Sequence, residues 1–254
     1  MGIDIERMRA KLAALKNKGG SNVFWKPQDG EQTIRIVPTA DGDPFKEFWF
    51  HYNLGSNNGF LSPKKNYGEA DPLDEFVRSL FSEGTDDSIK MAKNLMARQR
   101  FFAPVLVRGE EDKGVRIWGF GKMAYQQLLE LVLNPDYGDI TDTDEGTDLV
   151  IKYGKAPGDR FPSTNITPRR RTSPLCAEEA GGSDKALEWL ENIPDFDGLF
   201  ERKTPAEVGA MLDEWLAGES GESASSGNTE VAKYSSNETD QVKAAFDDLL
   251  QQSA

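Results

Sequence analysis

The chain has 254 residues and a mass of 28.2 kDa, enough for one large domain, and 37% of its residues are hydrophobic. No run approaches the roughly 20 apolar residues of a membrane-spanning helix. One cysteine (Cys176) and one histidine (His51) exclude an intramolecular disulfide and the thiolate-zinc and multi-histidine metal sites. The first twenty residues lack the apolar core of a secretion signal, so we expect an intracellular, soluble, metal-free protein.

The net charge of −13 is concentrated at one end of the chain. Residues 176–254 hold five basic and 18 acidic side chains, whereas residues 1–175 hold 25 of each sign. The first two thirds are therefore neutral overall and can display a basic face. The acidic total does not argue against a nucleic-acid ligand.

Residues 3–17 have the spacing of a short amphipathic helix. Its apolar positions are Ile5, Met8, Leu12 and Leu15, and its other faces carry Arg7, Arg9 and Lys11. The helix either packs on its own domain or docks as a basic arm on a neighbouring molecule. The residues alone leave both interpretations open.

From residue 24 to residue 174 the signals are mostly those of strands separated by turn residues. The expected strands are 33–38, 45–54, 100–109, 115–121 and 147–154, and the expected helices are 72–81, 86–98 and 122–133. Short strands of this kind indicate a small antiparallel barrel or sandwich. The sequence predicts an α+β protein: an OB-fold-like antiparallel β-barrel with helical insertions, in a core of residues 21–217.

The C-terminal third begins with two predicted helices, 183–192 and 204–217. Thr204, Pro205 and Glu207 form the pattern of a capping box at the second one. Residues 218–240 are rich in Gly, Ser, Asn and Glu, which is typical of a disordered tether. The last segment (residues 238–252) regains helical spacing, and we expect residues 218–254 to be an acidic tail that recruits a partner. Its candidate contacts are Phe246, Asp247, Asp248, Leu249 and Leu250.

Catalysis is poorly supported by the sequence. The carboxylates between Asp136 and Asp148 do not match a calcium loop, since Gly146 and Tyr153 stand where ligands are needed. His51 lies among strand aromatics, where a core histidine is commoner than a general base. We expect no enzymatic activity, and the alternative of a metal-dependent enzyme built on these carboxylates ranks lower.

Binding of single-stranded nucleic acid is better supported, because such proteins combine basic grooves with aromatic rings on which bases stack. Cations and large aromatics alternate in two predicted neighbouring strands. The candidate residues are Arg98, Arg100, Phe101 and Phe102 in one strand, Arg116, Trp118, Phe120 and Lys122 in the next, and Arg35, Arg169, Arg170 and Arg171 elsewhere. In the competing interpretation these rings fill the core and the arginines extend from its rim. A second alternative is a protein-interaction adaptor with a peptide-binding barrel and an acidic recruiting tail.

Four short motifs resemble the single-stranded DNA-binding, helix-destabilising replication protein of T-even-type phages, and the similarity runs over nearly the whole chain. They are TIRIVP (33–38), RQRFFAPVLV (98–107), VRIWGFGK (115–122) and RFPSTNITP (160–168). The resemblance implies sequence-independent, cooperative binding in phage DNA replication, recombination and repair, in the cytoplasm of an infected bacterium. It places Arg35 and Phe161 at the DNA. It also assigns Arg7, Arg9 and Lys11 to self-association, and the tail to replication and recombination enzymes.

The chain departs from that family at one point. The best-known member carries a zinc-binding loop of three cysteines and a histidine where this chain reads LSPKKNYGEADPLDEF (61–76). We therefore expect no zinc, and a subdomain packed by Leu73, Phe76 and Leu80 instead. Tyr67, in the same segment, is a weaker candidate for base contact.

Overall fold

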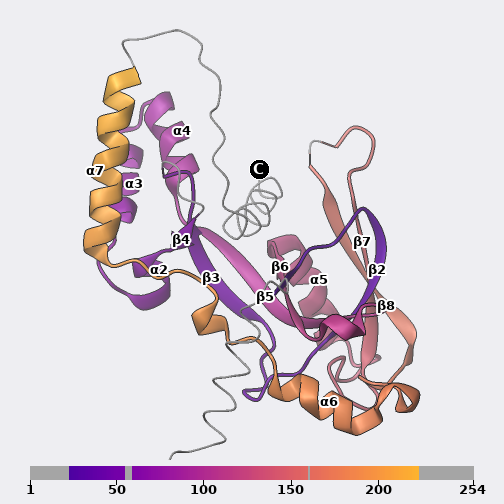
Figure 1. Ribbon diagram of the computed structural model, residues 1–254. Helices are drawn as coiled ribbons and strands as arrows, with labels where there is room; N and C mark the ends of the chain where they lie inside the picture. Colours follow the sequence, from indigo (N-terminus) through magenta and orange to yellow (C-terminus); the bar gives the residue numbers. More distant parts are fainter. Residues whose placement is uncertain (1–22, 55–58, 160, 223–254) are drawn as a thin grey trace, which may run out of the picture.

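The computed structural model describes residues 23–54, 59–159 and 161–222 (Figure 1). The strands are β1 (Phe24–Trp25), β2 (Gly30–Ile36), β3 (Lys46–His51), β4 (Phe60–Leu61), β5 (Arg98–Val107), β6 (Arg116–Phe120), β7 (Thr147–Gly154) and β8 (Ser163–Thr172). The helices are α2 (Pro63–Tyr67), α3 (Pro72–Glu83), α4 (Asp86–Leu95), α5 (Lys122–Leu133), α6 (Gly182–Glu191) and α7 (Pro205–Glu222), with short 3-10 turns η1 (Glu111–Lys113), η2 (Glu178–Ala180) and η3 (Phe196–Gly198).

The strands form one mostly antiparallel sheet in which β5 is shared by three neighbours. One edge of β5 pairs with β6, and the other pairs first with β3 and then with β2. The path through the sheet is β1-β6-β5-β2-β7-β8, with only β1 and β6 parallel. Its two end strands, β1 and β8, are not hydrogen-bonded to each other, so the sheet is open. The α+β class is confirmed, whereas a closed barrel is not shown.

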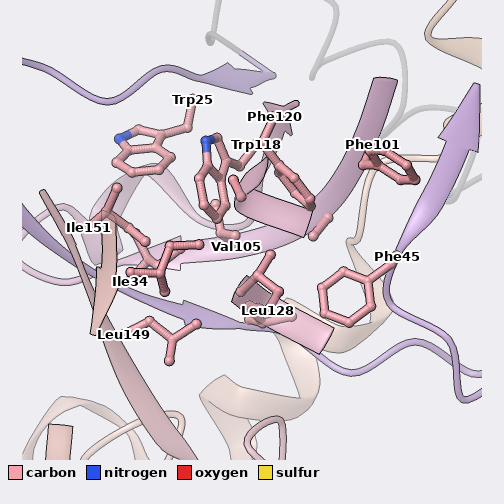
Figure 2. Close-up of a cluster of buried hydrophobic side chains, with 14 of the residues drawn as sticks. Trp25, Ile34, Phe45, Phe101, Val105, Trp118, Phe120, Leu128, Leu149 and Ile151 are labelled. Carbon is pink, nitrogen blue, oxygen red and sulfur yellow. The ribbon is translucent and has the colours of Figure 1, made fainter. Parts of the chain in front are cut away.

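The period of two along β5 sends side chains into two separate cores. Phe101, Ala103, Val105 and Val107 enter the main core, which also receives residues of β2, β6, β7 and α5 (Figure 2). Phe102 lies on the opposite face, in a second cluster with Phe50 and with Phe200 from the chain after α6. β5 is therefore covered on both faces.

This double covering corrects the expectation that the strand aromatics are exposed. Phe101, Phe102, Trp118 and Phe120 are each at most 3% exposed. The Trp118 ring packs edge-on against Trp25 with centroids 5.8 Å apart, and lies 4.6 Å from Phe120. No face of these four rings is open to a base, because both sides of the central strands are covered by other elements.

Helices α3, α4 and α7 pack together beyond one end of β5, and α6 lies at the other end of the fold (Figure 1). Leu73 and Leu80 are buried there as expected, while Phe76 is half-buried against Trp215. Helix α4 ends at Leu95 rather than at residue 98, since β5 already begins at Arg98.

The start of α7 confirms the capping box. The Thr204 amide donates to the Glu207 carboxylate (2.7 Å), and the Glu207 amide donates to the Thr204 hydroxyl (3.3 Å). The helix continues to Glu222, into the segment expected to be a tether.

Replacing Trp118 by alanine should destabilise the domain, because the ring is 1% exposed and its removal leaves a cavity in the main core. The expected loss in free energy of unfolding is about 3–5 kcal/mol, measured by urea denaturation. Trp49→Ala is the matched control, since Trp49 lies on strand β3 but is only half-buried. Equal losses in the two variants would contradict this description of the core.

Candidate nucleic-acid interface

Arg35 is a structural residue rather than an exposed contact. Its side chain is fully buried, and Nε donates to Asp148 Oδ1 at 3.0 Å. Nη1 donates to the Asp142 carbonyl (3.2 Å), and Nη2 donates to the carbonyl and hydroxyl of Ser173 (2.7 and 2.8 Å). A Cβ at Gly146 would lie 2.5 Å from Arg35 Nη1, so the loop closes over this guanidinium only with glycine there. The prediction that Arg35 faces DNA is corrected by these contacts.

Asp148 is shared by a second arginine that the sequence analysis missed. Arg108 donates from Nε and Nη2 to the Asp148 carboxylate at 2.9–3.1 Å, and from Nη1 to the Leu175 carbonyl at 2.7 Å. Two guanidinium groups thus converge on one carboxylate that is 7% exposed. Charge-assisted bonds of this kind hold all three side chains in place.

The arginine triplet forms a bulge in the end strand β8. Leu149 pairs with Pro168 and Thr147 pairs with Thr172, so Arg169, Arg170 and Arg171 together face the single position Asp148. We call these three residues the arginine bulge. All three are exposed, and Arg169 Nη2 donates to the Thr33 hydroxyl (3.2 Å). In the part of the chain that the structure describes, none of them makes an ion pair with a carboxylate.

The remaining strand cations are largely withdrawn from solvent. Arg100 is 2% exposed, and its Nη1 lies close to Gly121 at the start of α5. Arg116 is 6% exposed and bonds Glu110 at 2.5 Å. Arg98 is half-buried, and its pKa is lowered by burial and by the charge of Arg100. Arg100 and Arg116 are therefore corrected to buried positions.

Three other predicted residues are more accessible but are not brought together. Lys122 is exposed at the first position of α5, and Phe161 is half-buried just before β8. Tyr67 is 41% exposed at the end of α2, with the Arg202 guanidinium 4.1 Å from its ring centroid. The structure does not gather the predicted residues into one exposed set.

A half-exposed aromatic surface that the sequence analysis missed lies on β3. Trp49 pairs with Gln99 of β5, and Lys65 Nζ lies 5.3 Å from the Trp49 ring centroid. On the same face, Glu47 pairs with Phe101, on which Tyr125 stacks with centroids 3.9 Å apart. We call Glu47, Trp49, Lys65, Gln99 and Tyr125 the β3 face. Burial raises the pKa of Tyr125, and the carboxylates of Asp43 and Glu47 raise it further.

A buried polar cluster joins β3 to the helices. His51 Nε2 lies 3.0 Å from Asp71 Oδ2 and His51 Nδ1 lies 3.0 Å from the Leu95 carbonyl, while the Ser62 hydroxyl donates to Asp71 Oδ2 at 2.6 Å. We call His51, Ser62, Asp71 and the Leu95 carbonyl the His51 cluster. Burial raises the pKa of Asp71, but the hydrogen bonds and charge of His51 and the bond from Ser62 outweigh it, so that pKa is lowered.

The His51 cluster does not fit a zinc ion. Its donor and acceptor atoms are bonded to one another at 2.6–3.0 Å, whereas two ligands of a tetrahedral zinc stand about 3.3 Å apart. A serine hydroxyl is also outside zinc's usual protein ligands. Among the described residues, no group of three or more His, Cys, Asp or Glu is arranged to hold a metal ion.

Comparison with known protein families and with curated proteins finds no match to this chain. Within the described ranges, every helix is too short or too polar to cross a bilayer. The residues predicted for self-association (Arg7, Arg9, Lys11) and for partner recruitment (Phe246, Asp247, Asp248, Leu249, Leu250) lie outside the described residues.

Asp71 makes stability depend on pH in a defined direction. Because its pKa is lowered in the folded state, its contribution is present above about pH 4 and is lost as pH falls through the folded value. Asp71→Asn should lower the free energy of unfolding by about 3 kcal/mol at pH 7, because it removes the buried carboxylate that bonds His51 and Ser62. The difference in free energy of unfolding between this variant and wild type, measured by urea denaturation, should shrink as the pH falls from 5 to 3.

The control for this measurement is Asp136→Asn, at an exposed position, which should follow the wild-type curve at every pH. A difference between Asp71→Asn and wild type that stays constant from pH 7 to pH 3 would show that the Asp71 carboxylate is not the group that titrates.

Proposed function

We propose that this chain is a non-enzymatic protein that binds single-stranded nucleic acid, DNA in the first place, without regard to sequence. The observation that carries the proposal is the arginine bulge. Three guanidinium groups are exposed at one point of the sheet, and the carboxylate opposite them, Asp148, is already bonded to Arg35 and Arg108. Because Asp148 does not neutralise these three guanidinium groups, their positive charge is suited to binding the phosphates of a nucleic-acid backbone.

The β3 face supplies the second element that such binding needs. Trp49 is half-buried with a lysine beside its ring, and every base can stack on a ring of this kind regardless of its identity. The stacking role predicted for Trp118 and its neighbours thus passes to Trp49 in this proposal. Among the residues predicted from the sequence, Tyr67 and Phe161 are rings that remain partly exposed. We further interpret the open sheet, with α5 inserted between β6 and β7, as an OB-like arrangement.

The peptide-binding alternative would use the outer edge of β8, and several features oppose it. The Gln127 carboxamide already bonds the Thr164 carbonyl (3.1 Å) and the Ile166 amide (2.9 Å), while Pro168 has no N–H to offer. Arginines at such an edge also discourage pairing with another strand. The three arginines of β8 could also serve only to keep this edge strand from pairing with another chain, without any ligand. The following substitution separates this explanation from nucleic-acid binding.

Arg169→Gln, Arg170→Gln and Arg171→Gln in one variant should weaken binding to oligo-dT and make it less dependent on salt. If each arginine neutralises one phosphate, the slope of log affinity against log salt should fall by about 2. Fluorescence titration from low to high salt measures this slope. Thermal stability should change little, because the three side chains are exposed.

A charge-matched control replaces Lys90, Lys93 and Lys113 by glutamine, since these exposed lysines lie on α4 and η1, outside the strands of the sheet. Its slope should stay close to that of wild type. Equal reductions in both variants would mean that only net charge matters, and an unchanged slope in the arginine variant would sink the proposal.

The resemblance to phage single-strand-binding proteins extends the proposal to the two ends of the chain. We propose that the basic segment of residues 1–20 mediates contiguous binding in phage DNA replication, recombination and repair. The acidic segment of residues 218–254 would recruit replication enzymes and compete with DNA for the arginine bulge.

Deleting residues 223–254 should raise the affinity for oligo-dT at low salt and have little effect at high salt, since charge competition is screened by ions. Titration at two ionic strengths measures the difference. If the affinity of the truncated protein equals that of the full chain at both, the tail does not compete.

A further inference from the structure

The His51 cluster lies where four chain segments end or begin. Ser62 is the N-cap of α2, Asp71 is the N-cap of α3, and Leu95 is the last residue of α4, while His51 is the last residue of β3. His51, Ser62 and Asp71 are at most 1% exposed. The two ring nitrogens of His51 contact the Leu95 carbonyl and the Asp71 carboxylate, each at 3.0 Å, so the ring joins the end of α4 to the start of α3.

Ser62 connects this cluster directly to the β3 face. Its hydroxyl donates to Asp71 and accepts from the Lys65 amide (3.3 Å), while its own amide donates to the Trp49 carbonyl (2.9 Å). Asn66, on the next turn, bonds both backbone groups of Trp49, at 3.0 and 2.7 Å. The backbone of Trp49 and the backbone of Lys65 are therefore both fixed through α2.

We propose that the His51 cluster is a metal-independent strap that positions Lys65 over the Trp49 ring and so presents that ring to a nucleobase. His51, Ser62 and Asp71 are positioning residues in this role, since none of them is exposed. The segment 61–76, which by resemblance corresponds to the zinc loop of the phage proteins, is here closed by hydrogen bonds among its own residues and His51. The presentation of Trp49 to a base rests on the proposed function, whereas the strap itself does not.

The structural part is tested by fluorine NMR of the full chain labelled with 5-fluorotryptophan, with the Trp49 signal assigned from Trp49→Phe. Ser62→Ala and Asp71→Asn should both shift or broaden the Trp49 signal and leave those of Trp25 and Trp118 in place. Thr85→Ala is the matched control, because Thr85 caps α4 in the same way but is not part of the cluster. Dialysis against EDTA should leave the Trp49 signal unchanged.

The functional part is tested by oligo-dT titration of the same proteins. Trp49→Ala should raise the dissociation constant about 5-fold or more in the wild-type background. The same substitution should add less than 2-fold in the Ser62→Ala background, where the ring is already misplaced.

The possible results separate the two claims. A Trp49 signal that is identical in wild type, Ser62→Ala and Asp71→Asn overturns the strap, and a signal altered by EDTA overturns its metal independence. Full additivity of Trp49→Ala and Ser62→Ala overturns the positioning role in binding. If the wild-type chain does not bind oligo-dT, the proposed function fails, and the fluorine signals still decide on the strap.

Discussion

A single carboxylate, that of Asp148, determines how positive charge is distributed over one side of this protein. It bonds a fully buried guanidinium, Arg35, and a partly exposed one, Arg108. The Arg35 guanidinium could not be buried without the Asp148 carboxylate, because an uncompensated charge in the interior is very unfavourable. With Asp148 committed to these two residues, the three arginines opposite it on β8 are left to solvent.

The sequence predicted local features well, because these depend on neighbours in the chain. The strands β2, β5 and β6 follow from alternation and turn residues, and the capping box at Thr204 follows from four consecutive residues. The burial of Arg35 could not be predicted in this way, since its carboxylate partner lies 113 residues further along the chain. A cation in a strand was interpreted as a surface residue because its partner was not known.

The aromatic residues show more clearly that burial cannot be predicted where it depends on residues distant in the chain. Trp118 and Phe120 share a face of β6 with Arg116, and that combination is typical of an exposed platform. In the fold Arg116 reaches Glu110, and the rings are covered by Trp25 and Tyr125. A signal for Trp49 was present in the sequence, however. Its strand neighbours at a spacing of two are Glu47 and His51, whereas the apolar Phe48 and Phe50 lie on the other face.

The proposal therefore keeps Arg169, Arg170 and Arg171, which the sequence suggested, and moves the stacking ring from Trp118 and its neighbours to Trp49. The arginine triplet, a candidate from the sequence, is exposed at a bulge, whereas the rings predicted on β5 and β6 are core residues that hold the sheet together. The most direct test follows the arginine side chains themselves, by 15N NMR of the Nε–H groups during titration with oligo-dT. The signals of Arg169, Arg170 and Arg171 should move on binding while those of Arg35 and Arg108 stay fixed. Binding that leaves the three bulge signals unmoved would contradict the account.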